Sequence, residues 1–149
     1  MPLSVALGIH VVDVLAYPVM QLPGGQSLAF VEQVRTTVAG AAAGTAIDMA
    51  RLGLEVYSIG AIGEDSRGDF LIATLQKYGV NTSGIVRKPQ AETSCSVLPI
   101  RPNGERPVLH PPCNPAEERF ISKIVCHIVM SSGRLWATRY RLALIKRVL

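Results

Sequence analysis

The stretch that decides the fold runs from Val38 to Tyr78 and reads VAGAAAGTAIDMARLGLEVYSIGAIGEDSRGDFLIATLQKY. Its alanine-rich part after Gly40 has high helix propensity, and Gly53 stands where a glycine with positive φ commonly ends a helix. The apolar segment 55–59 that follows predicts a buried strand. We therefore expect loop, helix, strand, loop and helix, which is a βα repeat of an α/β domain.

A second helix is expected after the glycine-rich loop 60–63. Asp65 and Ser66 are candidate N-cap residues, and Ser66 and Asp69 have the spacing of a capping box. Gly79 is expected to close this helix. The residues predicted to share one face of this helix are Phe70, Leu71, Thr74, Leu75 and Tyr78.

These motifs resemble the N-terminal signature of the PfkB-type, or ribokinase-like, carbohydrate kinases. In that family a Gly-Gly turn precedes a helix start that bears an Asn, and a G-x-x-G-x-D-x-x-G segment follows the next strand. Gly60, Gly63, Asp65 and Gly68 hold the spacing of that second segment, whereas Ala39 replaces the first glycine of the turn. The resemblance implies a three-layer α/β/α fold with a parallel sheet and a small projecting β-hairpin that acts as a lid.

The apolar run from Leu3 to Val12 predicts the first buried strand of a parallel sheet, and it ends at Asp13. The resemblance implies that Asp13 stands at the carboxyl end of this strand and contacts sugar hydroxyls. A fixed carboxylate accepts two hydroxyl hydrogen bonds, and ligands of open α/β sheets bind beyond the carboxyl ends of the strands. The alternative is that Asp13 caps a loop.

Two glycines bear on the substrate site that the resemblance implies. Gly40 at a helix N-terminus would let a ligand hydroxyl approach exposed backbone N–H groups, and the alternative is a tight turn packed against the sheet. Gly44 stands where the family has Asn, so the side-chain donor and acceptor of that amide are missing. A glycine inside a helix is also expected to destabilise it by roughly 1 kcal/mol relative to Ala.

A β-hairpin is expected from the strand candidate Thr93–Ile100, the turn Asn103-Gly104 and the returning strand Arg106–His110. In the family such strands form the lid over the sugar. The residues that follow, 110–114, resemble the family's Pro-Gly-Ala-Asn loop with Cys113 in place of Gly, and the resemblance assigns Asn114 to the substrate site.

The resemblance covers residues 1–115, and residues 116–149 are expected to form a divergent basic tail. In the family, the C-terminal half supplies nucleotide-binding loops and a G-A-G-D segment whose Asp deprotonates the attacking hydroxyl. No G-A-G-D occurs in these 149 residues, so no residue is assigned a catalytic role. The chain is expected to be truncated before the nucleotide site.

The family reaction transfers the γ-phosphoryl group of ATP to a hydroxyl of a sugar or nucleoside, with Mg²⁺ bridging the phosphates. ATP and Mg²⁺ are not expected to bind well to this chain, which is expected to be inactive alone. The alternative function is a non-catalytic sugar-binding or protein-interaction module, including a homodimer formed through the lid hairpin. A dinucleotide-binding domain is disfavoured because no G-x-G-x-x-G follows the first strand.

Composition and charge limit the remaining classes. Residues 1–118 carry 8 Lys and Arg against 11 Asp and Glu, whereas residues 119–149 carry 7 Lys and Arg and no acid. The body therefore lacks a basic nucleic-acid footprint. No apolar run reaches 18 residues, and the three cysteines show no disulfide or zinc spacing. We expect a cytoplasmic protein with no metal site, no nucleic-acid partner and no membrane partner.

Overall fold

The computed structural model describes residues 3–111, which form six strands and two helices. The βα repeat predicted from the opening stretch is present at its centre. In chain order the elements are β1 (Leu3–Leu7), β2 (Val11–Tyr17), β3 (Gln33–Ala39), α1 (Ala41–Arg51), β4 (Glu55–Gly63), α2 (Ser66–Lys77), β5 (Asn81–Lys88) and β6 (Cys95–Pro99).

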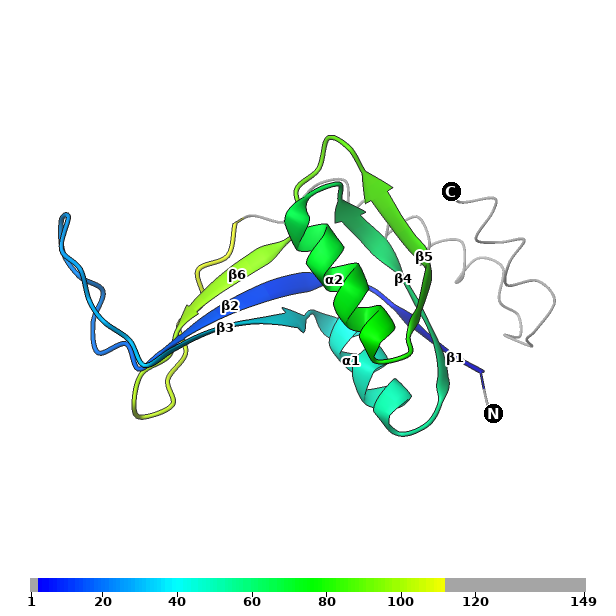
Figure 1. Ribbon diagram of the computed structural model, residues 1–149, viewed down its shortest axis with the longest axis horizontal. Coiled ribbons are helices and arrows are strands. Elements are labelled where there is room, and N and C mark those ends of the chain that lie inside the picture. Colours follow the sequence, from blue (N-terminus) through cyan, green and yellow to red (C-terminus); the bar gives the residue numbers. More distant parts are fainter. Residues whose placement is uncertain (1–2, 112–149) are drawn as a thin grey trace, which may run out of the picture.

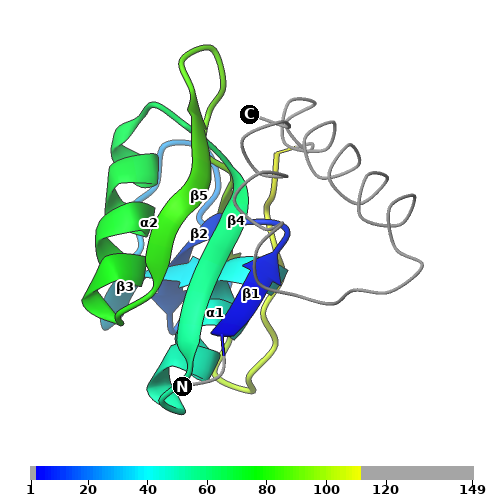
Figure 2. The same ribbon diagram turned by 90° about the vertical axis from the view of Figure 1, so that its right-hand side faces the viewer.

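The first sheet, called here the core sheet, has the strand order β1-β4-β5, and all its strands are parallel. α1 packs on β1 and β4, and α2 packs on β5 and β4. Figure 2 shows both helices on the same side of the core sheet. The parallel α/β architecture that the sequence predicted is therefore confirmed.

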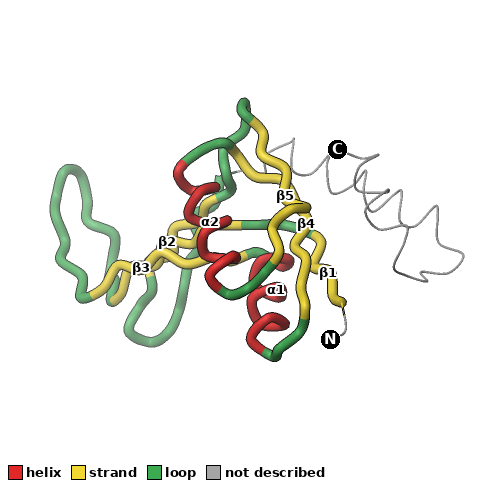
Figure 3. The backbone as a smooth tube through the Cα atoms, turned by 45° about the vertical axis from the view of Figure 1, so that its right-hand side comes forward, coloured by secondary structure: helices red, strands yellow, loops and turns green. Residues whose placement is uncertain are grey.

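The second sheet, called here the projecting sheet, has the strand order β3-β2-β6. β2 and β3 are antiparallel, whereas β2 and β6 are parallel. This sheet extends away from the helices, and the long β2–β3 loop forms its far end (Figures 1 and 3). The projecting element that the sequence predicted is thus a sheet of three strands rather than one hairpin.

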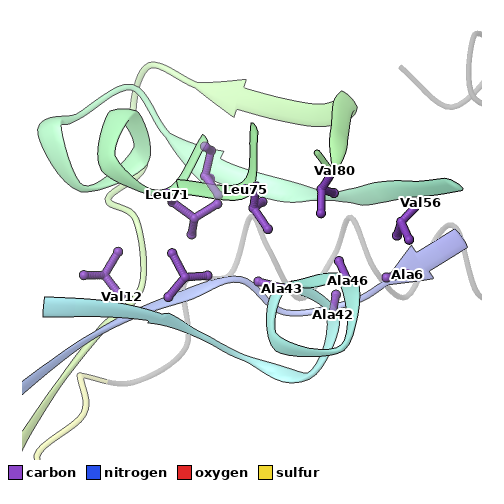
Figure 4. Close-up of a cluster of buried hydrophobic side chains, with 11 residues drawn as sticks. Ala6, Val12, Ala42, Ala43, Ala46, Val56, Leu71, Leu75 and Val80 are labelled. Atoms are coloured by element: carbon purple, nitrogen blue, oxygen red, sulfur yellow. The ribbon is translucent and has the colours of Figure 1, made fainter. Parts of the chain in front are cut away.

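A single cluster of small and branched side chains joins the two sheets and the two helices. Three alanines of α1 supply one side of it, which lets that helix lie close to the sheets (Figure 4). Leu71 and Leu75 of α2 are fully buried on the opposite side. The members of the cluster are Ala6, Val12, Val38, Ala42, Ala43, Ala46, Val56, Ile62, Leu71, Leu75 and Val80.

The prediction of one strand over Leu3–Val12 is wrong. The chain forms β1 in the core sheet, crosses over at residues 8–10 and begins β2 in the projecting sheet. Gly8 has φ 149°, which side-chain-bearing residues rarely adopt, and the buried His10 fills the crossing. Asp13 consequently lies inside β2 and not at the carboxyl end of the first strand.

The boundaries of the predicted βα repeat also need correction. β4 continues to Gly63, so the expected glycine-rich loop belongs mostly to the strand. Asp65 alone is the N-cap of α2, and the capping box of Ser66 with Asp69 does not form, because the Asp69 carboxylate pairs with Arg87 at 2.6 Å. Tyr78, predicted to share a helical face with Leu71 and Leu75, is the C-cap of α2 and is 41% exposed.

The predicted hairpin is only partly present. β6 spans Cys95–Pro99 and pairs with β2, while residues 106–110 form no strand. A turn after Arg101 brings the chain back, and Val97 and Leu109 exchange two backbone hydrogen bonds of 2.9 Å in an isolated antiparallel bridge. Two prolines near the returning segment, Pro107 and Pro111, lack the N–H that a longer ladder requires.

Candidate functional site

Asp13 occupies the middle strand of the projecting sheet. It is in register with Thr37 of β3 on one side and with Ser96 of β6 on the other. Residues that are paired across a sheet point to the same face, so these three polar side chains form a row. Asp13 is partly buried and belongs to the middle strand of this sheet. Such a row is suited to binding a ligand with several hydroxyl groups.

Gly40 lies beside this row. Ala39, the last residue of β3, pairs with Val11, and Gly40 then turns the chain into α1 as its N-cap. Its φ is 91°, and a Cβ at this position would collide with the Ile9 carbonyl group, so the turn excludes any side chain. The structure therefore favours the tight turn for Gly40. No side chain within residues 3–111 caps the α1 N-terminus.

The sequence analysis tied two further positions to the substrate site, Gly44 and Asn114, and the structure describes only the first of them. Gly44 lies in the first turns of α1, and nothing stands within 4 Å of a Cβ built there, so this position does not require a glycine. Asn114, with Cys113, lies outside the described residues. Of the predicted site residues, the structure thus brings Asp13 and Gly40 to the same junction between the sheets.

The most specific sequence motif forms a separate cluster, called here the Asp65–Thr93 cluster. Asp65 Oδ1 accepts hydrogen bonds from the Gly68 N–H at 2.8 Å and from the Thr93 hydroxyl at 2.6 Å. Asp65 Oδ2 accepts the Thr93 N–H at 2.9 Å, and the Thr93 Oγ1 accepts the Gly63 N–H at 3.0 Å. The sequence indicated the cap at Asp65 but not Thr93, because nothing in the local pattern links residues that are 28 apart.

Each glycine of this motif is required by close approach of another part of the chain. A Cβ on Gly63 would collide with the Ala91 carbonyl oxygen, and one on Gly68 would lie 2.5 Å from the Gly63 carbonyl oxygen. A Cβ on Gly60 would collide with the imidazole ring of His10. The motif therefore holds together the segments that connect the two sheets.

The ionisation of Asp65 matches this structural role. Partial burial pushes the pKa of Asp65 upward, but the hydrogen bonds from Thr93 and Gly68 and the charge of Arg67 outweigh it, so its pKa lies below the usual value. Arg67 also pairs with Glu92 at 2.8 Å. A carboxylate held ionised and already accepting three hydrogen bonds is a poor general base, and these contacts are those of a structural cap.

His10 is the second buried polar group that the sequence analysis missed. Its Nδ1 lies 2.9 Å from the Gly8 carbonyl oxygen and its Nε2 lies 2.7 Å from the Ser58 hydroxyl. Because a carbonyl only accepts, Nδ1 carries the proton and Nε2 accepts from Ser58. Burial lowers the pKa of His10 to about 4, against a smaller opposing effect of the Gly8 carbonyl. The neutral ring thereby fastens the β1–β2 crossing to β4.

The described part of the chain offers neither a metal centre nor a membrane-spanning helix. Residues 3–111 contain no group of three or more His, Cys, Asp or Glu side chains arranged to hold a metal ion. No helix in this range is long and apolar enough to cross a membrane.

Comparison with known proteins finds a matching family model and curated relatives that are named as sugar kinases. The family model described as pfkB family carbohydrate kinase matches residues 1–118. A 5-dehydro-2-deoxygluconokinase of Geobacillus kaustophilus is 29% identical, over 64% of this chain and 32% of that protein. A fructokinase-1 of Oryza sativa subsp. japonica is 37% identical, over 55% of this chain and 25% of that protein.

Solved structures show the same relationship. A protein of Agrobacterium tumefaciens, described as a putative ribokinase, superposes with a TM-score of 0.65 and 28% identity, covering 72% of this chain and 35% of that one. A ribokinase of Arabidopsis thaliana complexed with ribose and ATP gives a TM-score of 0.64 over 74% of this chain and 35% of that one; at 22% identity, it supports the fold alone. The chain thus spans between 25% and 35% of the length of these relatives.

Proposed function

The chain belongs to the pfkB family of carbohydrate kinases, and from that premise we propose that it carries the sugar-binding side of an ATP-dependent sugar or nucleoside kinase. The supporting observation is the row of Thr37, Asp13 and Ser96 on the projecting sheet, next to the Gly40 turn. The carboxylate of Asp13 would accept hydrogen bonds from two hydroxyls of the sugar. Asn114 is proposed to complete this site.

The same proposal assigns the residues of the α1 N-terminus a secondary role. The Ala42 N–H already donates to the Ile9 carbonyl at 3.2 Å, and the Gly44 N–H donates to the Gly40 carbonyl at 3.0 Å. The remaining N–H groups of the first turn have no partner within the helix and would donate to a sugar oxygen, with the positive end of the helix dipole favouring it. Gly40 contributes here through its backbone turn and not through an open space.

The complete family reaction also needs a nucleotide site and a base for the sugar hydroxyl. The sequence contains no G-A-G-D segment, so we propose that this chain binds sugar but does not turn over alone. ATP and Mg²⁺ would supply the phosphoryl group and the neutralising charge in a complete kinase of the family. We place the chain in the cytoplasm, where a free thiol such as Cys95 stays reduced, and assign the kinase domain to residues 1–115.

Thermal unfolding of the full 149-residue chain with D-fructose, D-ribose, adenosine and Mg-ATP tests this proposal. At least one hydroxyl-bearing ligand is expected to raise the melting temperature by mass action. Asp13→Asn should remove that increase, whereas Asp48→Asn, the same charge change on an exposed position of α1, should keep it. Sugar-dependent ADP release by the purified chain would contradict the proposed lack of turnover.

The face of the projecting sheet opposite Asp13 carries exposed apolar side chains, which favours a second role, the association of two copies of the chain. Val34, Val97 and Leu109 belong to this face by register and are 63%, 45% and 53% exposed. We propose that a second copy of the chain covers them, which leaves the Asp13 face free. Light scattering should show a dimer that Val97→Ser together with Leu109→Ser converts to a monomer, while the control Leu52→Ser at the end of α1 does not.

A further inference from the structure

The polar row around Asp13 continues one residue beyond the strands of the projecting sheet. The antiparallel bridge between Val97 and Leu109 places His110 opposite Ser96. The Ser96 hydroxyl and Nδ1 of His110 lie 3.0 Å apart. Thr37, Asp13, Ser96 and His110 therefore stand side by side on one face, each about 5 Å from the next along the hydrogen-bonding direction.

Ser96 and His110 differ in how far their side chains are exposed. Ser96 is 6% exposed, whereas His110 is exposed. Nδ1 of His110 is engaged by Ser96, and the structure records no partner for its Nε2 within residues 3–111. The buried serine therefore fixes the ring, and the exposed ring keeps a second nitrogen for another contact.

The hydrogen-bonding groups of the row show what a contact from Nε2 of His110 would contribute to ligand binding. The carboxylate of Asp13 only accepts hydrogen bonds, so by itself it selects for hydroxyl donors. When the Ser96 hydroxyl donates to Nδ1, the neutral imidazole carries its proton on Nε2 and becomes a donor. A sugar bound along this face would then meet an acceptor at Asp13 and a donor at His110.

We propose that His110 is a specificity-determining residue for the substrate and that Ser96 positions it. His110 would donate to a hydroxyl or carbonyl oxygen of the sugar that lies further along the carbon chain than the hydroxyls held by Asp13. The ligand class is a polyhydroxylated molecule long enough to reach from Asp13 toward His110. This inference rests on the proposed sugar site and adds the residue that selects among sugars.

Titration calorimetry of the full chain with D-fructose and with D-ribose tests the assignment. His110→Phe keeps an aromatic ring but loses the donor, and it should weaken the preferred sugar by about five- to tenfold. Ser96→Ala should weaken the same sugar, and the double variant should lose no more than His110→Phe alone. His110→Gln, which retains an amide donor, should recover part of the affinity. The control is Thr36→Val, on the opposite face of β3.

The ratio of the two affinities separates recognition from a structural role. If His110 only held residues 100–111 in place, its variants would lower the melting temperature and leave the fructose-to-ribose ratio unchanged, and the proposal would be overturned. If Asp13→Asn abolishes binding while His110→Phe binds both sugars like the unmodified chain, the sugar site stands and the role of His110 is refuted. Absence of binding by the unmodified chain would refute both.

Discussion

Replacing Thr93 by Val should destabilise the fold far more than the loss of one hydroxyl on a surface would. Thr93 is 1% exposed, and its hydroxyl both donates to the ionised Asp65 and accepts the Gly63 N–H. Valine has nearly the same shape, so the change removes the two hydrogen bonds while leaving the packing volume almost unaltered.

The magnitude follows from the two partners that lose their contacts. A hydrogen bond to a charged group contributes about 1.5–3 kcal/mol, and a buried N–H left without an acceptor costs about 1–3 kcal/mol. Asp65 retains the N–H donors of Gly68 and Thr93, which moderates the loss. We expect the free energy of unfolding to fall by about 3 kcal/mol, a large part of the stability of a small domain.

Urea denaturation followed by circular dichroism at pH 7 measures this change. Thr93→Ser keeps the hydroxyl and removes one methyl group, so it should cost about 1 kcal/mol. Thr36→Val, at an exposed position of β3, should stay within about 0.5 kcal/mol. The role assigned to the Asp65–Thr93 cluster would be refuted if Thr93→Val were no more destabilising than Thr93→Ser.

Two further predictions concern the crossing at His10. Gly60→Ala should lower the free energy of unfolding by about 1–3 kcal/mol, because the new methyl group meets the imidazole ring of His10. Gly44→Ala has open space around the new methyl group and should stabilise α1 by up to about 1 kcal/mol. Equal effects of the two variants in urea denaturation would contradict the close packing of Gly60 on His10. The pKa of His10 is lowered to about 4 in the folded state, so the unfolded chain binds the proton first as pH falls below 6.5. The contribution of His10 to the free energy of unfolding should be constant above that pH and should fall by about 3 kcal/mol on approaching pH 4. His10→Asn should remove this part of the pH dependence.

Local elements could be predicted well from the sequence, and long-range contacts poorly. Helix propensity, capping residues and apolar runs located α1, β4 and α2, because those signals act within a few residues. The break at Gly8 was missed because the apolar run continues through it without a change in pattern. The step from the core sheet to the projecting sheet depends on His10 meeting Ser58, 48 residues away, and periodicity carries no such information.

The site shows the same division between local and long-range information. The family resemblance predicts Asp13 as a site residue, but its neighbours Thr37 and Ser96 can be named only when the strand register is known. Conversely, the motif with the clearest spacing, from Gly60 to Gly68, makes close contacts with His10, Ala91 and Thr93 that hold chain segments together. A specific motif in this fold can therefore mark a place where chain segments must approach closely.

The structural motif and the candidate site are connected through geometry. The chain passes from the core sheet to the projecting sheet at residues 8–10 and again at residues 89–94, and it returns once, from β3 through α1 to β4. The two passages toward the projecting sheet are held by His10 and by the Asp65–Thr93 cluster. β2, which carries Asp13, begins directly after the first crossing, and β6, which carries Ser96, begins directly after the second. Weakening either crossing should shift one side of the polar row relative to the other. Thr93→Val is therefore expected to reduce sugar affinity as well as stability, even though Thr93 belongs to the crossing and not to the polar row.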